Sequence, residues 1–347
     1  MTIGPAFLWY IILFVLLGLY LIFDAYELGA GMAYGLFADK DDEKAKILKS
    51  IRSVWDANEI WLLSFFALAY LIFPEFFRTV LKTMKDFIFL FIFLYILLAV
   101  SQNLLRIFFD KPYRKILEWL YVSSSFLLTG ILGLFLAQLI RGFNPDAVPV
   151  LAPYLSPFVA NPAFIDWFSI SFTLLFTVII LLNGLGWIVH RVSGAFGRKL
   201  KFKIQKLSVT GIVLVLAVFI LYFFINKSSF EYFIAYPAWI VFPVLMIGSF
   251  AGLIMIRTYQ KDNKGLLLAT NLLIYFWIAL MILQYPYLIH SAPSFSGINI
   301  YHTEFHALED YHIRWWTIAV TVLLLIYSVL VHKFSKGHAL FATKEKD

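Results

Sequence analysis

The sequence predicts an all-α integral membrane protein, a single polytopic transmembrane domain spanning residues 1–347. Hydrophobic residues make up 62% of the chain and charged residues 14%, whereas soluble domains are about half apolar and a quarter charged. The mean hydropathy is +0.84. The apolar residues gather into about nine continuous segments, each long enough to supply the roughly 20 helical residues that cross a bilayer. Together these observations favour a bundle of transmembrane helices.

The predicted helices are separated by polar or proline-containing connections. Each segment is continuously apolar and lacks the two-residue alternation of a barrel strand, so helices are expected. No basic leader or small-residue cleavage site precedes the first segment, which predicts a retained helix and not a signal peptide. We place the nine helices near residues 6–37, 53–73, 87–105, 117–140, 166–190, 207–225, 233–256, 266–290 and 315–332.

The basic residues predict the orientation. Most of the 28 Lys and Arg residues fall in alternate connections, and such connections face the cytoplasm under the positive-inside rule. The N-terminus is therefore expected outside and the C-terminus in the cytoplasm. The connection at 191–206 carries six of these residues and is interpreted as a solvated stretch facing lipid, with a specific lipid or partner contact as the alternative. The net charge of +7 thus indicates membrane lipid and no nucleic acid.

Four carboxylates lie in the first two predicted helices, where an ionised side chain costs at least ~2.5 kcal/mol on insertion scales. Asp24 and Glu27 are three residues apart in the first helix, and Asp56 and Glu59 repeat that spacing in the second. Residues three apart share a helix face. Trp55 and Asn58 flank this second pair, and the six side chains Asp24, Glu27, Asp56, Glu59, Asn58 and Trp55 form our candidate proton path.

Depth along the two helices predicts the order of the carboxylates. At ~1.5 Å per residue, Asp56 lies nearest the cytoplasm, followed by Glu59, Glu27 and Asp24. Such a ladder is typical of proton relays inside membranes. The alternative is structural: the first helix overshoots the bilayer, both of its carboxylates pair with lysines of the inner connection, and Asp56 is an ordinary helix-start residue favoured by the dipole.

Two further groups in the opening helices bear on packing. Gly29, Gly31 and Gly35 form a small-residue stripe that predicts close helix packing, because small residues let helices approach in lipid. No strand precedes them, so a nucleotide-binding loop is excluded. At the inner end of the third helix, Ser101, Gln102 and Asn103 precede Arg106, which is interpreted as a boundary residue that snorkels to the interface or as a partner of one carboxylate.

The chain has no cysteine and seven histidines, which limits cofactor chemistry. None of the histidines falls in the middle of a predicted helix, so the chain is a poor host for haem, whose iron is commonly held by His or Met. His302 and His306 lie near Glu304 and His312 in an outer connection and would share a metal only if that segment were helical. A solvated polar loop is the simpler interpretation, and no metal site and no catalytic residue is predicted in this chain.

Two motifs resemble a known family. The run Asp-Ala-Tyr-Glu-Leu-Gly-Ala-Gly-Met at 24–32 and the run Trp-Asp-Ala-Asn-Glu-Ile-Trp at 55–61 are similar to the first two helices of cytochrome bd-type quinol oxidase subunit II. Phe-Pro at 73–74 follows at the family's place. Weaker similarity at 137–142, 161–162 and 285–286 extends along the chain. The family usually has aspartate at the position of Glu27.

The resemblance implies a haem-free subunit II of a respiratory quinol:oxygen oxidoreductase in a bacterial or archaeal plasma membrane. It implies a partner subunit I that carries haems b and d, quinol as the substrate of the complex, and a small accessory subunit as a further partner. A bound quinone in this chain is left open. The aspartate matching Asp56 lies on the proton route toward subunit I in that family. This chain is then expected to scaffold subunit I and to supply a cytoplasmic proton path.

Two other functions remain open from the residues alone. A stand-alone secondary transporter of an ion or small solute would need the same buried acids, but it commonly shows inverted repeats with broken helices, which the sequence lacks. A purely structural partner would carry four inert carboxylates. Co-purification with a haem protein distinguishes all three.

Overall fold

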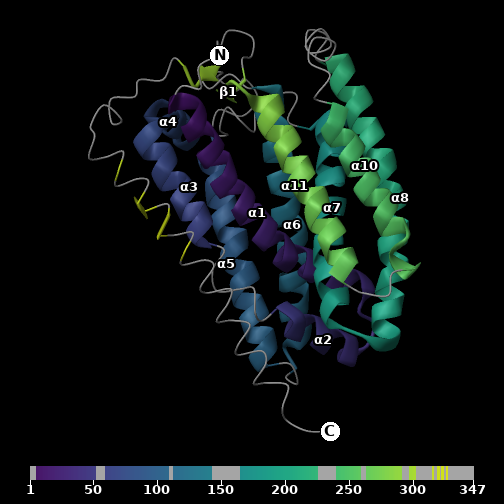
Figure 1. The fold of residues 1–347 in the computed structure, drawn as a ribbon. Helices are drawn as coiled ribbons and strands as arrows, with labels where there is room; N and C mark the ends of the chain where they lie inside the picture. The colour runs from purple at the N-terminus through teal and green to yellow at the C-terminus, as the bar shows by residue number, and fades with distance from the viewer. Residues whose placement is uncertain are drawn as a thin grey trace.

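The computed structural model describes residues 5–51, 59–108, 112–142, 165–225, 240–258, 263–290 and 297–301, and isolated positions between 315 and 326. These residues form a helical bundle with one short hairpin (Figure 1). The helices are α1 (Pro5–Phe37), α2 (Asp41–Ile51), α3 (Glu59–Ile72), α4 (Pro74–Thr83), α5 (Lys85–Ile107), α6 (Arg114–Arg141), α7 (Trp167–Arg191), α8 (Gly194–Ile225), α10 (Val241–Ile254), the 3-10 turn η2 (Ile256–Thr258) and α11 (Asn263–Gln284). Strands β1 (Tyr287–Ile289) and β2 (Ile298–Asn299) pair antiparallel.

Six of the described helices are long and apolar enough to cross a membrane: α1, α5, α6, α7, α8 and α11. The bent pair α3 and α4 makes a seventh if it counts as one span. Helix α10 is apolar but only 14 residues long. Most of the ninth predicted helix, 315–332, and residues 233–239 of the seventh lie outside the described residues. The prediction of nine helices and of their orientation therefore stays a prediction, whereas the all-helical, multi-pass class is confirmed.

Helix α7 occupies the centre of the bundle, and most residues of its apolar membrane-spanning stretch are buried inside the protein. It packs against α1, α6, α8 and α11.

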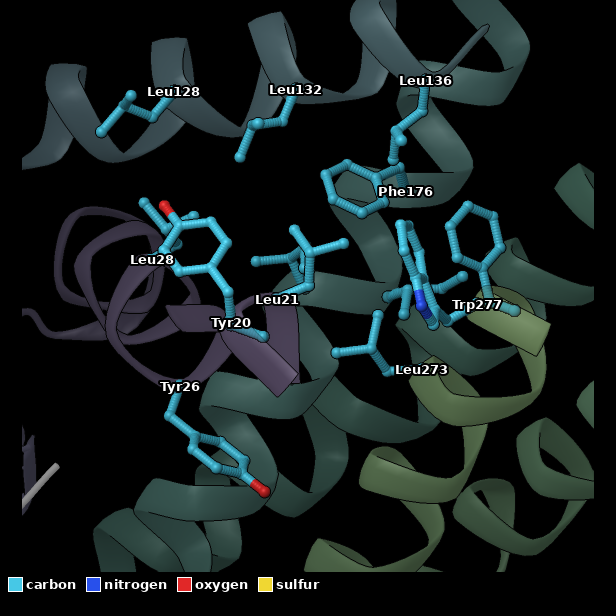
Figure 2. Close-up of a cluster of buried hydrophobic side chains, with 14 of the residues drawn as sticks. Tyr20, Leu21, Tyr26, Leu28, Leu128, Leu132, Leu136, Phe176, Leu273 and Trp277 are labelled. Atoms are coloured by element: carbon cyan, nitrogen blue, oxygen red, sulfur yellow. The ribbon is translucent and has the colours of Figure 1, made fainter. Parts of the chain in front are cut away.

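Figure 2 shows the shared core of these helices. It contains Leu21 of α1, Leu132 and Leu136 of α6, Phe176 of α7 and Trp277 of α11. Because lipid is as apolar as these side chains, close van der Waals packing between the helices stabilises this core.

The close approach of α1 and α7 depends on glycine. A β-carbon built on Gly29 would overlap Ile180 and Gly184 of α7, and one built on Gly184 would overlap the Gly29 backbone. Gly31 faces Ser125 and Tyr121 of α6 with equally little space. Helices α1 and α7 therefore meet backbone to backbone, the arrangement that small residues permit in a membrane.

Three of the sequence-based helix boundaries are wrong, and one unexpected helix follows a correct one. The second helix ends at Ile72, close to the expected residue 73, but Pro74 then begins α4 at an angle of 118°, because proline starts helices readily but lacks the N–H needed inside one. The connection after α1 contains α2, whose apolar face is buried. Helix α8 begins at Gly194 and so includes most of the presumed loop 191–206. Helix α11 ends at Gln284, before Tyr285-Pro286 and strand β1.

An apolar cavity of about 330 Å³ lies inside the part of the bundle built by α1, α3, α5, α6 and α11. Phe76 and Val80 of α4 face it from one end of the molecule, near β1 in Figure 1. Helix α2 lies at the opposite end. The molecule thus has an apolar end beneath α4 and a charged end around α2.

Candidate functional site

The two carboxylates of α1 are buried inside the bundle. Asp24 is 1% exposed and Glu27 is 3% exposed. Both lie on the stretch of α1 that continues into the glycines facing α6 and α7, so the close helix packing that excludes water also surrounds these acids. An ionised group in such surroundings needs a compensating charge or hydrogen bond.

Glu59, the first residue of α3, joins this pair. It lies close enough to Asp24 and to Glu27 for their charges to interact. The Tyr95 hydroxyl of α5 donates a hydrogen bond of 2.5 Å to Glu59 Oε1. Helices α1, α3 and α5 thus bring together three acids, Asp24, Glu27 and Glu59, which we call the acidic cluster.

A second set of contacts reaches Glu27 from α5. The side-chain amide of Gln102 is completely buried. With its nitrogen toward α1, the nitrogen donates to Glu27 Oε1 and the amide oxygen accepts from Arg106 Nη2 at 2.9 Å. Gln102 and Arg106 are one helical turn apart. Of the two sequence-based interpretations of Arg106, the structure favours the one that links it to a carboxylate, although through an intervening amide.

Tyrosine hydroxyls border the acidic cluster. Tyr20 lies one turn from Asp24 on α1 and beside its carboxyl group. Tyr121 of α6 is fully buried and interacts electrostatically with Glu27 and Arg106. Hydroxyl groups both donate and accept hydrogen bonds, so the acids are surrounded by groups able to pass a proton. Neither tyrosine belongs to a sequence motif, and only their positions in the fold reveal them.

Three of the predicted path residues cannot be placed. Trp55, Asp56 and Asn58 fall in residues 52–58, outside the described part of the chain. Their role remains the expectation set out above. What the structure places is the other half of the predicted set: Asp24, Glu27 and Glu59 lie together.

A charged network closes the opposite end of the molecule, near α2. Glu118 of α6 accepts from Lys44 at 2.8 Å, from Arg114 at 2.7 Å and from Tyr34 at 2.7 Å. Arg114 also pairs with Asp41 at 2.6 Å. The sequence did not predict this network, because residues 38–52 were expected to form a charged loop. The acidic first turn of α2 was the available signal.

Basic residues of α8 complete the same end. Lys199 pairs with Asp39 at 2.8 Å and with Glu43 at 2.9 Å. Glu43 is partly buried, which opposes ionisation, but the Lys199 ammonium and two backbone amides outweigh this and hold the pKa of Glu43 below its ordinary value. The ion pairs therefore join α8 to the α1–α2 connection.

The histidines that the structure describes lie away from the acidic cluster. His190 is exposed near the end of α7, and the His290 ring bonds to the Leu283 carbonyl at 3.0 Å. Among the described residues, no group of three His, Cys, Asp or Glu side chains has the geometry of a metal site. His302 and His306 lie outside them.

The arrangement as a whole can bind and transfer protons. It has acids that interact, hydroxyls beside them, and a guanidinium that offsets part of their charge. Sites of this kind inside membranes mark proton routes.

Comparison with known proteins identifies the family of the chain. A family model described as cytochrome bd terminal oxidase subunit II matches residues 5–334. The chain is 25% identical over 215 residues to cytochrome bd ubiquinol oxidase subunit 2 of Bacillus subtilis (strain 168), which covers 60% of each chain. It is 22% identical over 142 residues to cytochrome bd-I ubiquinol oxidase subunit 2 of Escherichia coli (strain K12), covering 40% of this chain and 38% of the relative. The matches thus span less than two thirds of the length of these relatives.

A solved structure, described as the structure of bd oxidase from Geobacillus thermodenitrificans, shares the fold. Its TM-score is 0.70 at 17% identity, and the match covers 96% of this chain and 98% of that chain. The family model covers nearly the whole sequence. The chain therefore belongs to the cytochrome bd terminal oxidase subunit II family.

Proposed function

We propose that this chain is the haem-free subunit II of a membrane quinol:oxygen oxidoreductase, and that it supplies a proton path to the reaction centre of subunit I. The family and the names of the relatives support the first part. The single observation that carries the second part is the acidic cluster, in which three helices bring Asp24, Glu27 and Glu59 together in an apolar bundle.

The energetics favour a role beyond packing. Apolar side chains would fill the same space without the desolvation cost of several kcal/mol that each buried ion carries. Three acids beside one arginine cannot all be ionised at that cost, so part of the cluster holds protons. A group that holds a proton within a hydrogen-bonded network can also release it, which is what reduction of oxygen to water requires.

The path runs from the cytoplasm toward the partner. Asp56, which precedes Glu59 by three residues, is proposed as its outermost acid. Glu59 and Tyr95 form the half-buried edge of the cluster. Exposed apolar side chains of the same helices lie near them, among them Leu63 of α3 and Ile92 of α5, 68% and 47% exposed. We propose that this surface contacts subunit I, and that protons pass from Asp56 and Glu59 inward to Glu27 and Asp24.

Haem and quinol chemistry are assigned to the partner. The haems would supply electron transfer and oxygen binding, whereas this chain positions acids and excludes water around them. The same surface of α3 and α5 is the proposed scaffold contact. Any small accessory subunit would bind elsewhere on the lipid-facing helices.

The first test is co-purification. The affinity-tagged chain should bring down a haem-bearing protein with a reduced-minus-oxidised spectrum. Asp56→Asn should slow quinol-driven oxygen consumption without reducing the haem content of the complex. A chain that purifies alone and transports an ion or solute in liposomes would instead establish a transporter. Unchanged turnover in Asp56→Asn would remove Asp56 from the path.

A further inference from the structure

Gln102 separates a half-buried cation, Arg106, from a buried acid, Glu27. Its amide lies between Arg106 Nη2, at 2.9 Å, and Glu27 Oε1. Gln102 itself is completely buried on α5, whereas Arg106 reaches in from a half-buried position near the end of the same helix. An arginine and a glutamate this close would ordinarily form a direct, often bidentate, pair. Here an amide takes both contacts in place of that pair.

The surroundings of Glu27 make the separation significant. Among the described residues, the groups that interact with Glu27 are Asp24 and Tyr20 of α1, Glu59 of α3, Tyr95, Gln102 and Arg106 of α5, and Tyr121 of α6. Helix α7 also packs on α1 and carries its titratable groups, His190 and Arg191, at its end. The guanidinium of Arg106 is therefore the cation that acts on the acidic cluster within this set.

We propose that Gln102 is a positioning residue, which keeps Arg106 one amide away from Glu27 so that this acid can both take up and release a proton. The inference rests on the proposed proton path. A direct ion pair strongly favours the charged form of a carboxyl group and would hold Glu27 ionised. A proton carrier must instead be able to exist in both forms near the working pH. The amide transmits part of the positive charge and blocks the direct contact.

The amide itself neither gains nor loses a proton in this account. A proton that arrives from the cytoplasmic side through Asp56 and Glu59 binds to Glu27 and then leaves toward Asp24, with ordered water bridging any gap longer than a hydrogen bond. The amide nitrogen of Gln102 continues to donate to the ionised form. Glu27 thus alternates between two states, while Arg106 stays charged throughout.

The test uses the intact complex in native membranes and measures quinol-driven oxygen consumption as a function of pH. Gln102→Met removes the two hydrogen bonds of the amide and leaves a flexible apolar side chain that can move aside, so Arg106 can reach Glu27. The alkaline limb of the profile should move to lower pH by roughly 1 to 3 units, the size of the effect of a neighbouring arginine on a carboxyl group. Adding Arg106→Gln to this variant should return the limb toward its original position.

A matched control and a second variant complete the design. Gln138 of α6 is equally buried and bonds to Ser169, and Gln138→Met should leave the shape of the profile unchanged. If Gln102→Met does not assemble with haem, Gln102→Asn should give a smaller shift in the same direction. An unshifted profile, or a double variant slower than the single one at every pH, would overturn the positioning role. Full turnover in Glu27→Gln would instead overturn the proton path itself.

Discussion

Tyr95 of α5 donates a hydrogen bond of 2.5 Å to Glu59 of α3, and this bond links the two helices at the half-buried edge of the acidic cluster. Tyr95→Phe removes it without changing the shape of the ring. A hydrogen bond to a charged group contributes roughly 1.5 to 3 kcal/mol, so Glu59 should lose its fixed position and oxygen consumption should fall several-fold. Haem content, measured by difference spectroscopy, should not change.

Tyr70→Phe is the control for this prediction. Tyr70 lies on the same helix as Glu59, is 59% exposed, and packs its ring on Phe77. Its loss of a hydroxyl should leave turnover unaffected. If both substitutions slow oxygen consumption equally, the Tyr95→Phe effect does not come from the bond to Glu59.

The crossing of α1 and α7 predicts a sharp dependence on side-chain size. Gly29→Ala places a methyl group against the backbone of Ile180 and Gly184, which no rotamer change relieves. Forcing the helices apart should cost roughly 1 to 3 kcal/mol or more, and the thermal unfolding temperature of the purified complex should fall by several degrees.

Gly130 of α6 provides the comparison, because a β-carbon there would meet nothing within 4 Å. Gly130→Ala should be neutral or stabilise the helix by up to ~1 kcal/mol. If Gly29→Ala is as stable as Gly130→Ala, the close crossing does not support the fold in the way described.

The sequence was sufficient for the class of protein and for half of the candidate site. Continuous apolar runs identify α1, α5, α6 and α7 because a spanning helix must be apolar along its whole length. Asp24 and Glu27 were recognisable because charges are rare in such runs. The short connection between the first two predicted helices made it reasonable to expect Glu59 near Asp24 and Glu27.

What the sequence could not supply depends on contacts between distant segments. Gln102 looks like an ordinary polar residue at a helix end until α5 is placed against Glu27. Glu118 becomes significant only when α2 carries Lys44 to it. The break at Phe73 was visible as Phe-Pro, but hydropathy averages over such a break and gives no angle.

The network at Glu118 should stabilise the charged end of the molecule without affecting the chemistry. Glu118→Gln removes the ion pairs with Lys44 and Arg114 and weakens the bond from Tyr34. Because the glutamate side chain is only 15% exposed, the free energy of unfolding should fall by about 1 to 3 kcal/mol. The thermal unfolding temperature of the purified complex measures this loss.

Asp42→Asn is the matched substitution on α2. Asp42 pairs with Lys46 at 2.7 Å, but its side chain is 70% exposed, and such pairs contribute roughly 0.2 to 0.5 kcal/mol. A Glu118→Gln protein no less stable than Asp42→Asn would show that the partial burial of the network adds nothing.

Asp166, which caps α7, predicts an acid-sensitive contact at the end opposite α2. Partial burial opposes its ionisation, but the Ser169 backbone amide, the Ser169 side chain and the Arg141 guanidinium outweigh this and hold the pKa of Asp166 below its ordinary value. A lowered pKa stabilises the folded state above about pH 3.9, the unfolded value, and the contribution is lost as the pH falls through the folded value. Below pH 4, the thermal unfolding temperature of the wild type should therefore fall more steeply than that of Asp166→Asn. Parallel pH curves for the two proteins would contradict the contribution of this cap.

Proton uptake by the reconstituted complex tests the central account most directly. The purified oxidase in closed vesicles, oriented with this chain's charged end accessible, is given a pulse of oxygen, and the pH change of the outer solution is followed with time. Glu27→Gln should slow uptake by about 10²-fold, the range for loss of a positioned proton-transfer group, while the haem spectrum stays that of the wild type. Uptake at the wild-type rate would show that protons reach the haem-bearing subunit without the acids of this chain.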